Sequence, residues 1–319
     1  MYPAVASSYD EIDLTKVKTV PVRSRGNKVT IESFGEPIKG GKAFSRWADA
    51  LPDQLAVRRL RRLVRDMRRA VSGKDREILW MLGAHVIKCG LSRYIIELMK
   101  RGYVTTVALN GAGLIHDLEI ACFGETSEDV AANLERGTFG FSAETAAACF
   151  EAVAAVEREG VGLGEAVGAY LHAKGAPHED VSILSQANRL GVPATVHVAV
   201  GTDILAQHPG FDGAVWGRGS AVDFRIFARR VCNLGERGGV AINVGSAVIL
   251  PEIFLKAFSI ARNLGAPFDA LTTCNLDMIQ HCRPNENVLA RPTQFGGTAI
   301  ALTGHHEIMI PLIYSSVLS

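Results

Sequence analysis

The stretch that most constrains this fold covers residues 104–117 and reads VTTVALNGAGLIHD. Its first six residues are β-branched or apolar, which is typical of a buried parallel strand. Gly111 and Gly113 then break the pattern, and Leu114 and Leu118 follow at helical spacing, so the stretch predicts a strand, a glycine turn and a helix. The first N–H groups of such a helix are unpaired and favour a phosphate or carboxylate. We therefore expect an α/β protein with a ligand site at this turn.

The turn is not a complete dinucleotide-binding fingerprint. The G-x-G-x-x-G pattern needs Gly or Ala at its third position for close helix packing, and this chain has His116 there. The alternative interpretation is an ordinary strand-to-helix turn whose glycines serve backbone geometry alone.

Composition limits the class of protein. The chain has 319 residues, of which 48% are hydrophobic and 21% charged, as in ordinary soluble proteins. The net charge of +1 provides no field that would attract nucleic acid or a membrane. No uninterrupted apolar run reaches the ~18 residues of a membrane span, and acidic residues at 10, 11 and 13 argue against a signal peptide. The six cysteines form no C-x-x-C pair, which favours a reduced, cytoplasmic setting.

Organisation along the chain follows from turn residues and periodicity. Prolines and a glycine pair at 40–41 indicate an N-terminal arm over residues 1–44, with one short strand near 28–31. Residues 45–319 are predicted to form a single domain that opens with a helix over 47–71. Seven arginines surround the apolar stripe of that helix, and such a face is more often a solvated or subunit-bridging one than a nucleic-acid site.

From residue 77 onward, apolar segments alternate with helical patterns. The expected strands cover 78–87, 104–109, 196–200, 239–244, 270–274 and 299–303. The expected helices cover 92–99, a segment starting at 126–129, 142–173, 178–190, 222–234, 251–264 and a closing helix after 307. Trp216 is placed in a loop, and so are residues 275–292. This alternation predicts an α/β fold with a parallel sheet.

Polar, ionisable or glycine residues follow these strands. In open parallel sheets ligands bind beyond the carboxyl ends of the strands, so these residues are candidates for a binding site. They are His85, Lys88, Asn110, His116, Asp117, Glu119, Thr202, Asp203, Gly245, Ser246, Asp277, Glu286, His305, His306 and Glu307. Acids outnumber bases, which favours a cationic ligand such as a polyamine if the acids face inward. The alternative for each acid is a helix cap or a surface ion pair.

Two other uses of these residues are considered. His116, His281 and His305 could bind a metal, but no H-x-x-x-H or H-E-x-x-H spacing places two ligands on one helix face, and no metal is expected. Cys89 follows Lys88, whose charge would favour a reactive thiolate, although its apolar flank favours a buried core thiol.

Four longer motifs carry a resemblance to a known family. They are HVIKCG at 85–90, NGAGLIHDLE at 110–119, GETSEDV at 124–130 and GSAVILP at 245–251. Together, over about residues 45 to 312, they are similar to the bacterial deoxyhypusine synthase-like proteins. The resemblance implies a Rossmann-like parallel sheet with helices on both faces, NAD as cofactor, and a homotetramer with active sites at a dimer interface. It also implies dehydrogenation of spermidine and transfer of its aminobutyl group, through an imine, to an acceptor amine.

The resemblance assigns roles position by position. NAD contacts fall on His85, Asn110, Gly113, Gly245, Ser246, His305 and His306, and the glycine turn and strand ends add Gly111 and Thr202. Amine contacts fall near His116, Asp117, Asp203 and Glu286, with Glu119 as a further acid. His116, Asp117 or His306 would serve proton transfer.

Two departures from the family bear on mechanism. The lysine that carries the imine is replaced by Leu250, which cannot attack carbon, and the tryptophan that covers the amine falls at about Ala290. Lys88 is the better substitute for the lysine. Three hypotheses follow: an NAD-dependent transferase acting on a polyamine, an NAD-binding homologue without catalysis, and a metal-dependent hydrolase.

Overall fold

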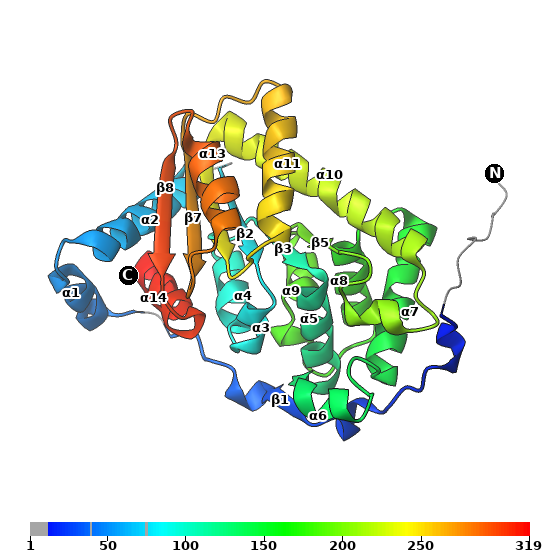
Figure 1. Cartoon of the computed structure of the whole chain (residues 1–319). Helices are drawn as coiled ribbons and strands as arrows, with labels where there is room; N and C mark the ends of the chain where they lie inside the picture. The colour runs from blue at the N-terminus through cyan, green and yellow to red at the C-terminus, as the bar shows by residue number, and fades with distance from the viewer. Residues whose placement is uncertain (1–11, 39, 74–75) are drawn as a thin grey trace.

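A computed structural model describes residues 12–38, 40–73 and 76–319 (Figure 1); the first part of the predicted arm lies outside these residues. The central sheet has six parallel strands in the order β5-β3-β2-β6-β7-β8. Their bounds are β2 Glu77–Leu82, β3 Thr106–Asn110, β5 Ala194–His197, β6 Gly239–Val244, β7 Leu271–Asp277 and β8 Thr298–Thr303. The chain winds outward from β2 to β5 on one side and from β6 to β8 on the other, which is the doubly wound order of Rossmann folds. The point where the order reverses lies between β2 and β6.

Helices cover both faces of this sheet, as predicted. They are α1 Lys42–Ala50, α2 Leu55–Ser72, α3 His85–Lys88, α4 Ser92–Lys100, α5 Gly111–Phe123, α6 Val130–Glu135, α7 Ala143–Glu159, α8 Leu163–Ala173, α9 Ile183–Leu190, α10 Gly213–Arg237, α11 Ile249–Asn263, α12 Cys282–Pro284, α13 Arg291–Thr293 and α14 His306–Leu318. A helix of π type covers Asn285–Ala290. Along β2, Trp80 and Leu82 belong to the core beneath α2, α4, α5 and α14, whereas Leu79 and Met81 belong to the core beneath α10 and α11. Because side chains along a strand alternate between the two faces of the sheet, β2 contributes to the hydrophobic core on each face.

The N-terminal arm crosses the base of the molecule in Figure 1 and pairs with a distant segment. Its strand β1 Asn27–Thr30, predicted near 28–31, lies antiparallel to β4 Glu125–Glu128. The expectation of a helix starting within 126–129 is wrong for residues 126–128, which form β4. Helix α6 begins one residue after Asp129, whose carboxylate accepts a hydrogen bond from the Ala132 N–H at 3.2 Å, as an N-cap residue does.

Three other expectations are corrected. The helix expected over 47–71 is two helices, α1 and α2, because the chain is extended at Leu51 before Pro52. Trp216 lies inside α10 rather than in a loop, since that helix already begins at Gly213. The loop expected over 275–292 contains the end of β7 and three short helices.

The arginines of α2 hold neighbouring elements together within the chain. Arg59 donates to the carbonyl of Ala301 in β8 at 3.2 Å, and Arg68 donates to the carbonyl of Val317 in α14 at 3.3 Å. Arg62 donates to Asp66 at 2.6 Å and to the Thr298 hydroxyl at 3.0 Å. These arginines therefore bind elements of the same chain. Within the described residues, no helix is long and apolar enough to cross a membrane.

Candidate functional site

Two glycines meet at the point where the strand order reverses. A Cβ on Gly83, after β2, would lie 2.4 Å from the Gly245 carbonyl oxygen, and a Cβ on Gly245, after β6, would lie 2.5 Å from Cε1 of His306. Gly245 also has a φ of +68°, which is unfavourable for other residues. Only glycine at both positions allows the two backbones and the imidazole to approach this closely.

His306 lies at the first position of α14 and is 1% exposed. Its ring is 5.8 Å from that of His85, edge to face, and its Nε2 is 3.8 Å from a carboxylate oxygen of Asp277. Neither ring nitrogen has a hydrogen-bond partner within the described residues. Burial lowers the pKa of His306, so the ring is neutral at pH 7. A buried polar group without a partner costs about 1–3 kcal/mol, which a hydrogen bond to a ligand would recover.

The neighbouring strand ends are held by amide side chains. Asn243 of β6 donates to Asn275 of β7 at 2.8 Å, Asn275 donates to Gln280 at 2.8 Å, and Gln280 donates to the Leu302 carbonyl of β8 at 3.0 Å. Beside them the Ser246 hydroxyl, 4% exposed, accepts from the backbone N–H of the residue four positions later at 3.2 Å. This network fixes three strand ends as a rigid floor.

The glycine turn after β3 has a different role from the one expected. The side chain of Asn110 accepts a hydrogen bond from the Gly113 N–H at 2.8 Å and so caps α5. A Cβ on Gly111 would lie 2.1 Å from a carboxylate oxygen of Asp203. The anion beside the first turn of α5 is therefore Asp203 itself, and packing accounts for Gly111. The structure therefore favours the alternative interpretation of this turn, in which its glycines allow the local backbone packing and do not directly bind a phosphate.

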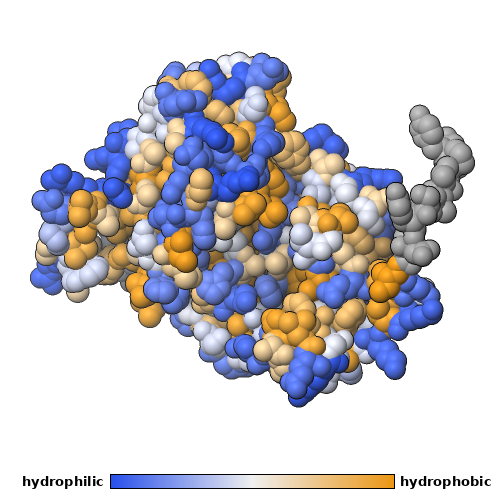
Figure 2. All heavy atoms as spheres, viewed as in Figure 1, coloured by the Kyte–Doolittle hydropathy of each residue, from blue (hydrophilic) through white to orange (hydrophobic). Residues whose placement is uncertain are grey.

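A pocket of about 230 Å³ opens beside this turn. It brings together five residues that the sequence singled out: Lys88, His116, Glu119, Thr202 and Asp203. The remaining lining residues come from the arm, from α5, from the region of β4 and α6, and from the segment after β5; they are Arg25, Ala112, Ile115, Ser127, Glu128, Val130, Phe139 and Ile204. At α6, Val130 is 43% and Leu134 is 60% exposed, and Figure 2 shows apolar residues gathered over this helix.

A hydrogen-bond relay sets the protonation of His116. The hydroxyl of Thr126 donates to Glu119 Oε2 at 2.5 Å and lies 2.7 Å from Nδ1 of His116. Because that hydroxyl proton is already committed to the carboxylate, the oxygen accepts from His116, which places the imidazole proton on Nδ1. Burial and the charge of Lys88 lower the pKa of His116 to about 3. Its Nε2 is therefore unprotonated at pH 7, but so low a pKa makes it a weak base, because an efficient general base has a pKa near the working pH.

Arg25 of the arm completes this relay, and the sequence analysis did not identify it. Its Nη2 lies 2.8 Å from Glu119 and its Nη1 lies 4.0 Å from Glu128, with all three side chains at most 6% exposed. Glu119 also accepts from the Thr145 hydroxyl at 2.8 Å. Glu119, predicted as a substrate contact, is thus an internal anchor of His116. No local pattern marks Arg25, because its partners lie about a hundred residues away in sequence.

Several predicted site residues do not line this pocket, among them Asp117, Glu286 and His305. Asp117 is fully buried, and its carboxylate accepts from the Ser182 hydroxyl at 2.6 Å and from the first N–H groups of α9 at 2.7 and 3.0 Å. It caps a helix, so its predicted amine contact and proton transfer are corrected. The side chain of Glu286 is 51% exposed and lies 3.8 Å from Arg291, and that of His305 is 62% exposed.

Cys89 is a half-buried thiol rather than a thiolate. Burial and the neighbouring carboxylate of Glu307 raise its pKa to about 11, against a smaller opposing effect of Lys88. Nucleophilic attack at neutral pH requires the thiolate, so the interpretation of Cys89 as a packing residue is favoured.

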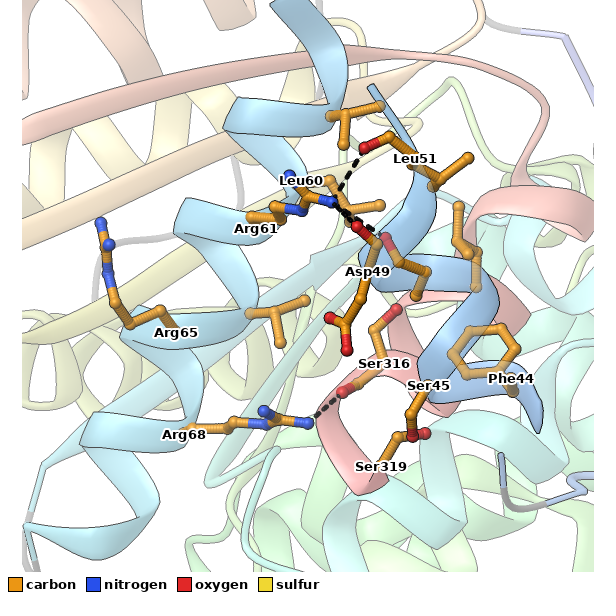
Figure 3. Close-up of a pocket in the computed structure, with 14 residues that line it drawn as sticks. Phe44, Ser45, Asp49, Leu51, Leu60, Arg61, Arg65, Arg68, Ser316 and Ser319 are labelled. Carbon is orange, nitrogen blue, oxygen red and sulfur yellow. Dashed lines mark hydrogen bonds between the residues drawn. The ribbon is translucent and has the colours of Figure 1, made fainter. Parts of the chain in front are cut away.

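A larger cavity of about 350 Å³ lies between α1, α2 and α14 (Figure 3). None of the predicted site residues lines it. Arg61 points toward α1 and donates to the carbonyls of Ala48, Asp49 and Leu51 at 2.9–3.1 Å. Arg68 points toward Ser316 and donates to its carbonyl at 2.5 Å. These guanidinium groups cap helix ends, so this cavity is not the candidate site.

Comparison with known proteins shows the fold. No known protein family matches the sequence, and no curated protein matches it either. Among solved structures, a "conserved putative LOR/SDH protein" from Methanococcus maripaludis S2 has a TM-score of 0.52 and 14% identity, covering 83% of this chain and 70% of that chain. A "putative deoxyhypusine synthase" from Entamoeba histolytica has a TM-score of 0.51 and 11% identity, covering 88% of this chain and 96% of that chain. The predicted Rossmann-like α/β fold is confirmed, and it is shared with a protein of the deoxyhypusine synthase type.

Proposed function

We propose that this protein is an NAD-dependent enzyme that oxidises an amine, in the manner of deoxyhypusine synthase-like proteins. The observation that carries the proposal is the pocket that brings the imidazole of His116 together with the carboxylate of Asp203. A general base beside a carboxylate suits a substrate that arrives as an ammonium ion.

The residues at the strand reversal fit a dinucleotide. The contact between Gly83 and Gly245 leaves no side chain over the backbone there, and both ring nitrogens of His306 are free to hydrogen-bond. His85, Ser246 and His306 would hold the cofactor, because ligands of doubly wound sheets bind at such a reversal. NAD supplies a hydride acceptor when it is bound.

The chain's own residues would prepare the amine. Asp203 attracts the ammonium group, and Nε2 of His116 takes one proton from its nitrogen, which restores the lone pair. That lone pair would form the C=N bond as hydride leaves the adjacent carbon for the cofactor, so the amine would become an iminium ion (a protonated imine) and the imidazole would be left protonated. The Glu119 carboxylate, acting through Thr126, stabilises the imidazolium.

The resemblance supports finer proposals about the substrate and the assembly. The amine would be a polyamine such as spermidine, and the aminobutyl group would pass to an acceptor amine. The protein would work as a cytoplasmic homotetramer. Leu250, which is fully buried, stands where the imine-carrying lysine is expected, so the acceptor amine would attack the imine directly.

Turnover with a panel of amines tests the proposal. Purified protein with NAD is mixed with polyamines, diamines and amino acids, and the absorbance of reduced nicotinamide and the product masses are followed. His116→Gln should lower turnover by about 10²–10⁴-fold while cofactor binding persists. His172→Gln is the matched control, because that ring is 53% exposed on α8. Absence of NAD reduction across the panel, or an unchanged His116→Gln variant, would contradict the proposal.

A second candidate is an NAD-binding homologue without catalysis, which Leu250 favours. Cofactor that co-purifies stoichiometrically but is never reduced would support it. The metal-dependent hydrolase is not proposed, because within the described part of the chain no three His, Cys, Asp or Glu residues form a metal-binding group.

A further inference from the structure

The charges that line the pocket do not all remain available to a ligand. Arg25 is neutralised by Glu119 and Glu128 in a buried ion pair. Glu128 also accepts from Asn133 at 2.8 Å and from the Gly140 N–H at 3.1 Å. The imidazole of the pocket is neutral, as described above. A ligand therefore meets two remaining charges, the ammonium of Lys88 and the carboxylate of Asp203.

Neither of these charges has an ion-pair partner in residues 12–38, 40–73 and 76–319. Lys88 is the last residue of α3, and Asp203 lies in the segment after β5; both are partly exposed to the pocket. Partly buried charges without counter-ions carry a desolvation cost, which a ligand of complementary charge would offset.

The two charges come to the pocket from different strands. Lys88 follows β2 and Asp203 follows β5, and these strands are separated in the sheet by β3. Neighbouring strands are ~4.8 Å apart, so β2 and β5 are about 10 Å apart. Helix α5, which follows the intervening strand β3, contributes Ile115 and His116 to the pocket lining. The order of the strands therefore favours a cationic group and an anionic group on either side of His116.

We propose that this pocket selects an amine that also carries a carboxylate, that is, an ω-amino acid, in place of the polyamine that the resemblance implies. Its ammonium group lies at Asp203, within reach of the base, and its carboxylate pairs with Lys88. This assigns Lys88 to binding rather than to the nucleophilic role expected from the sequence. An unsubstituted diamine would place its second ammonium near Lys88, and like charges in a partly buried site cost affinity.

Backbone strain at the same wall agrees with a built site. Ser127, which lines the pocket, has a φ of +63°. Such a conformation costs a non-glycine residue about 1–3 kcal/mol and is characteristic of ligand-binding segments. The inference rests on the proposed function for its chemistry, but the binding preference is testable without any turnover.

Calorimetric binding to the full chain compares 4-aminobutanoate with 1,4-diaminobutane, which each contain four carbon atoms. The amino acid should bind at least about tenfold more tightly, because its carboxylate forms a charge-assisted hydrogen bond with Lys88 where the diamine meets repulsion. Lys88→Gln should remove that preference by weakening the amino acid alone, whereas Asp203→Asn should weaken both ligands. Lys42→Gln, on the distant and exposed start of α1, makes the same change of charge and should leave both affinities unaltered.

The outcomes separate this inference from the proposed function. Equal or tighter binding of the diamine, an unchanged preference in Lys88→Gln, or no binding of 4-aminobutanoate would overturn the inference. Selective binding of the amino acid without any reduction of NAD would support the inference and count against the proposed function. Reduction of NAD with diamines alone would support the proposed function and count against the inference.

Discussion

Replacing Arg25 by methionine would test whether the N-terminal arm is an integral part of the site. The side chains of Arg25 and Glu119 are each 2% exposed and lie 2.8 Å apart, and Glu128 is 4.0 Å away on the other side. Methionine fills much of the volume but leaves two buried carboxylates facing one another. Removing one partner of a buried pair costs about 3–5 kcal/mol, out of a total stability of about 5–15 kcal/mol for a typical domain.

Urea unfolding followed by circular dichroism measures this cost. Arg23→Met is the matched control, since Arg23 is exposed two residues earlier in the arm, and such a surface change should stay within about 0.5 kcal/mol.

A double-mutant cycle isolates the pair. Glu119→Gln removes the charge and keeps one of the two oxygens that accept from Thr126 and Thr145. Arg25→Met/Glu119→Gln should therefore cost less than the sum of the single changes by about 2 kcal/mol or more. The reasoning is refuted if Arg25→Met costs under about 1 kcal/mol, or if the two single effects simply add. The double variant should also lose amine turnover, because the neutral amide no longer stabilises the imidazolium of His116.

Three further predictions concern stability and the cofactor. Burial raises the pKa of Asp223 to about 7, against the hydrogen bonds it accepts from backbone N–H groups. Between about pH 4 and pH 7 the folded state therefore holds this proton, whereas the unfolded state has lost it. The free energy of unfolding thus falls by up to about 4 kcal/mol as the pH rises through this range. Asp223→Asn should flatten this part of the urea-derived pH profile, and an unaltered profile would contradict the pKa. Asp117→Ala should cost about 2–4 kcal/mol of unfolding free energy by exposing two capped N–H groups, with calorimetric amine affinity unchanged in the folded protein; weakened affinity would restore Asp117 to the site. Gly83→Ala should weaken NAD binding, measured by fluorescence, because the new Cβ would overlap the Gly245 carbonyl. Gly217→Ala is the control and should leave NAD binding unchanged, because no atom lies near its Cβ. Equal NAD affinity in both variants would contradict a cofactor site at the point where the strand order reverses.

The sheet was predictable because each central strand is an apolar run closed by a glycine or polar residue. The segments expected at 239–244 and 299–303 agree with β6 and β8 to within one residue. The strand β4 was not predictable in this way. Its sequence, ETSE, is polar, and only pairing with β1, about a hundred residues earlier, makes it a strand. Such a nonlocal contact leaves no periodic signal.

The candidate site was predicted as a region rather than residue by residue. Parallel strands end at one edge, so residues that follow them collect there whatever their individual roles. Which of these side chains point into the pocket is a separate question, because consecutive residues of a helix point about 100° apart. On α5, His116 lines the pocket while Asp117 turns inward to cap α9. The sequence motif that contains both cannot distinguish the base from the cap.

Leu250 shows how packing limits the chemistry carried over from a resemblance. It is fully buried in the first turn of α11, in one apolar cluster with Phe254, Val288 and Leu289. A lysine at this position would begin its side chain inside that cluster, where its charged form is strongly disfavoured. Large apolar neighbours on α11 and on the helix over Asn285–Ala290 close the space. The packing therefore leaves no place for an imine-carrying lysine at this position, and under the proposed function an acceptor amine would have to react with the imine directly.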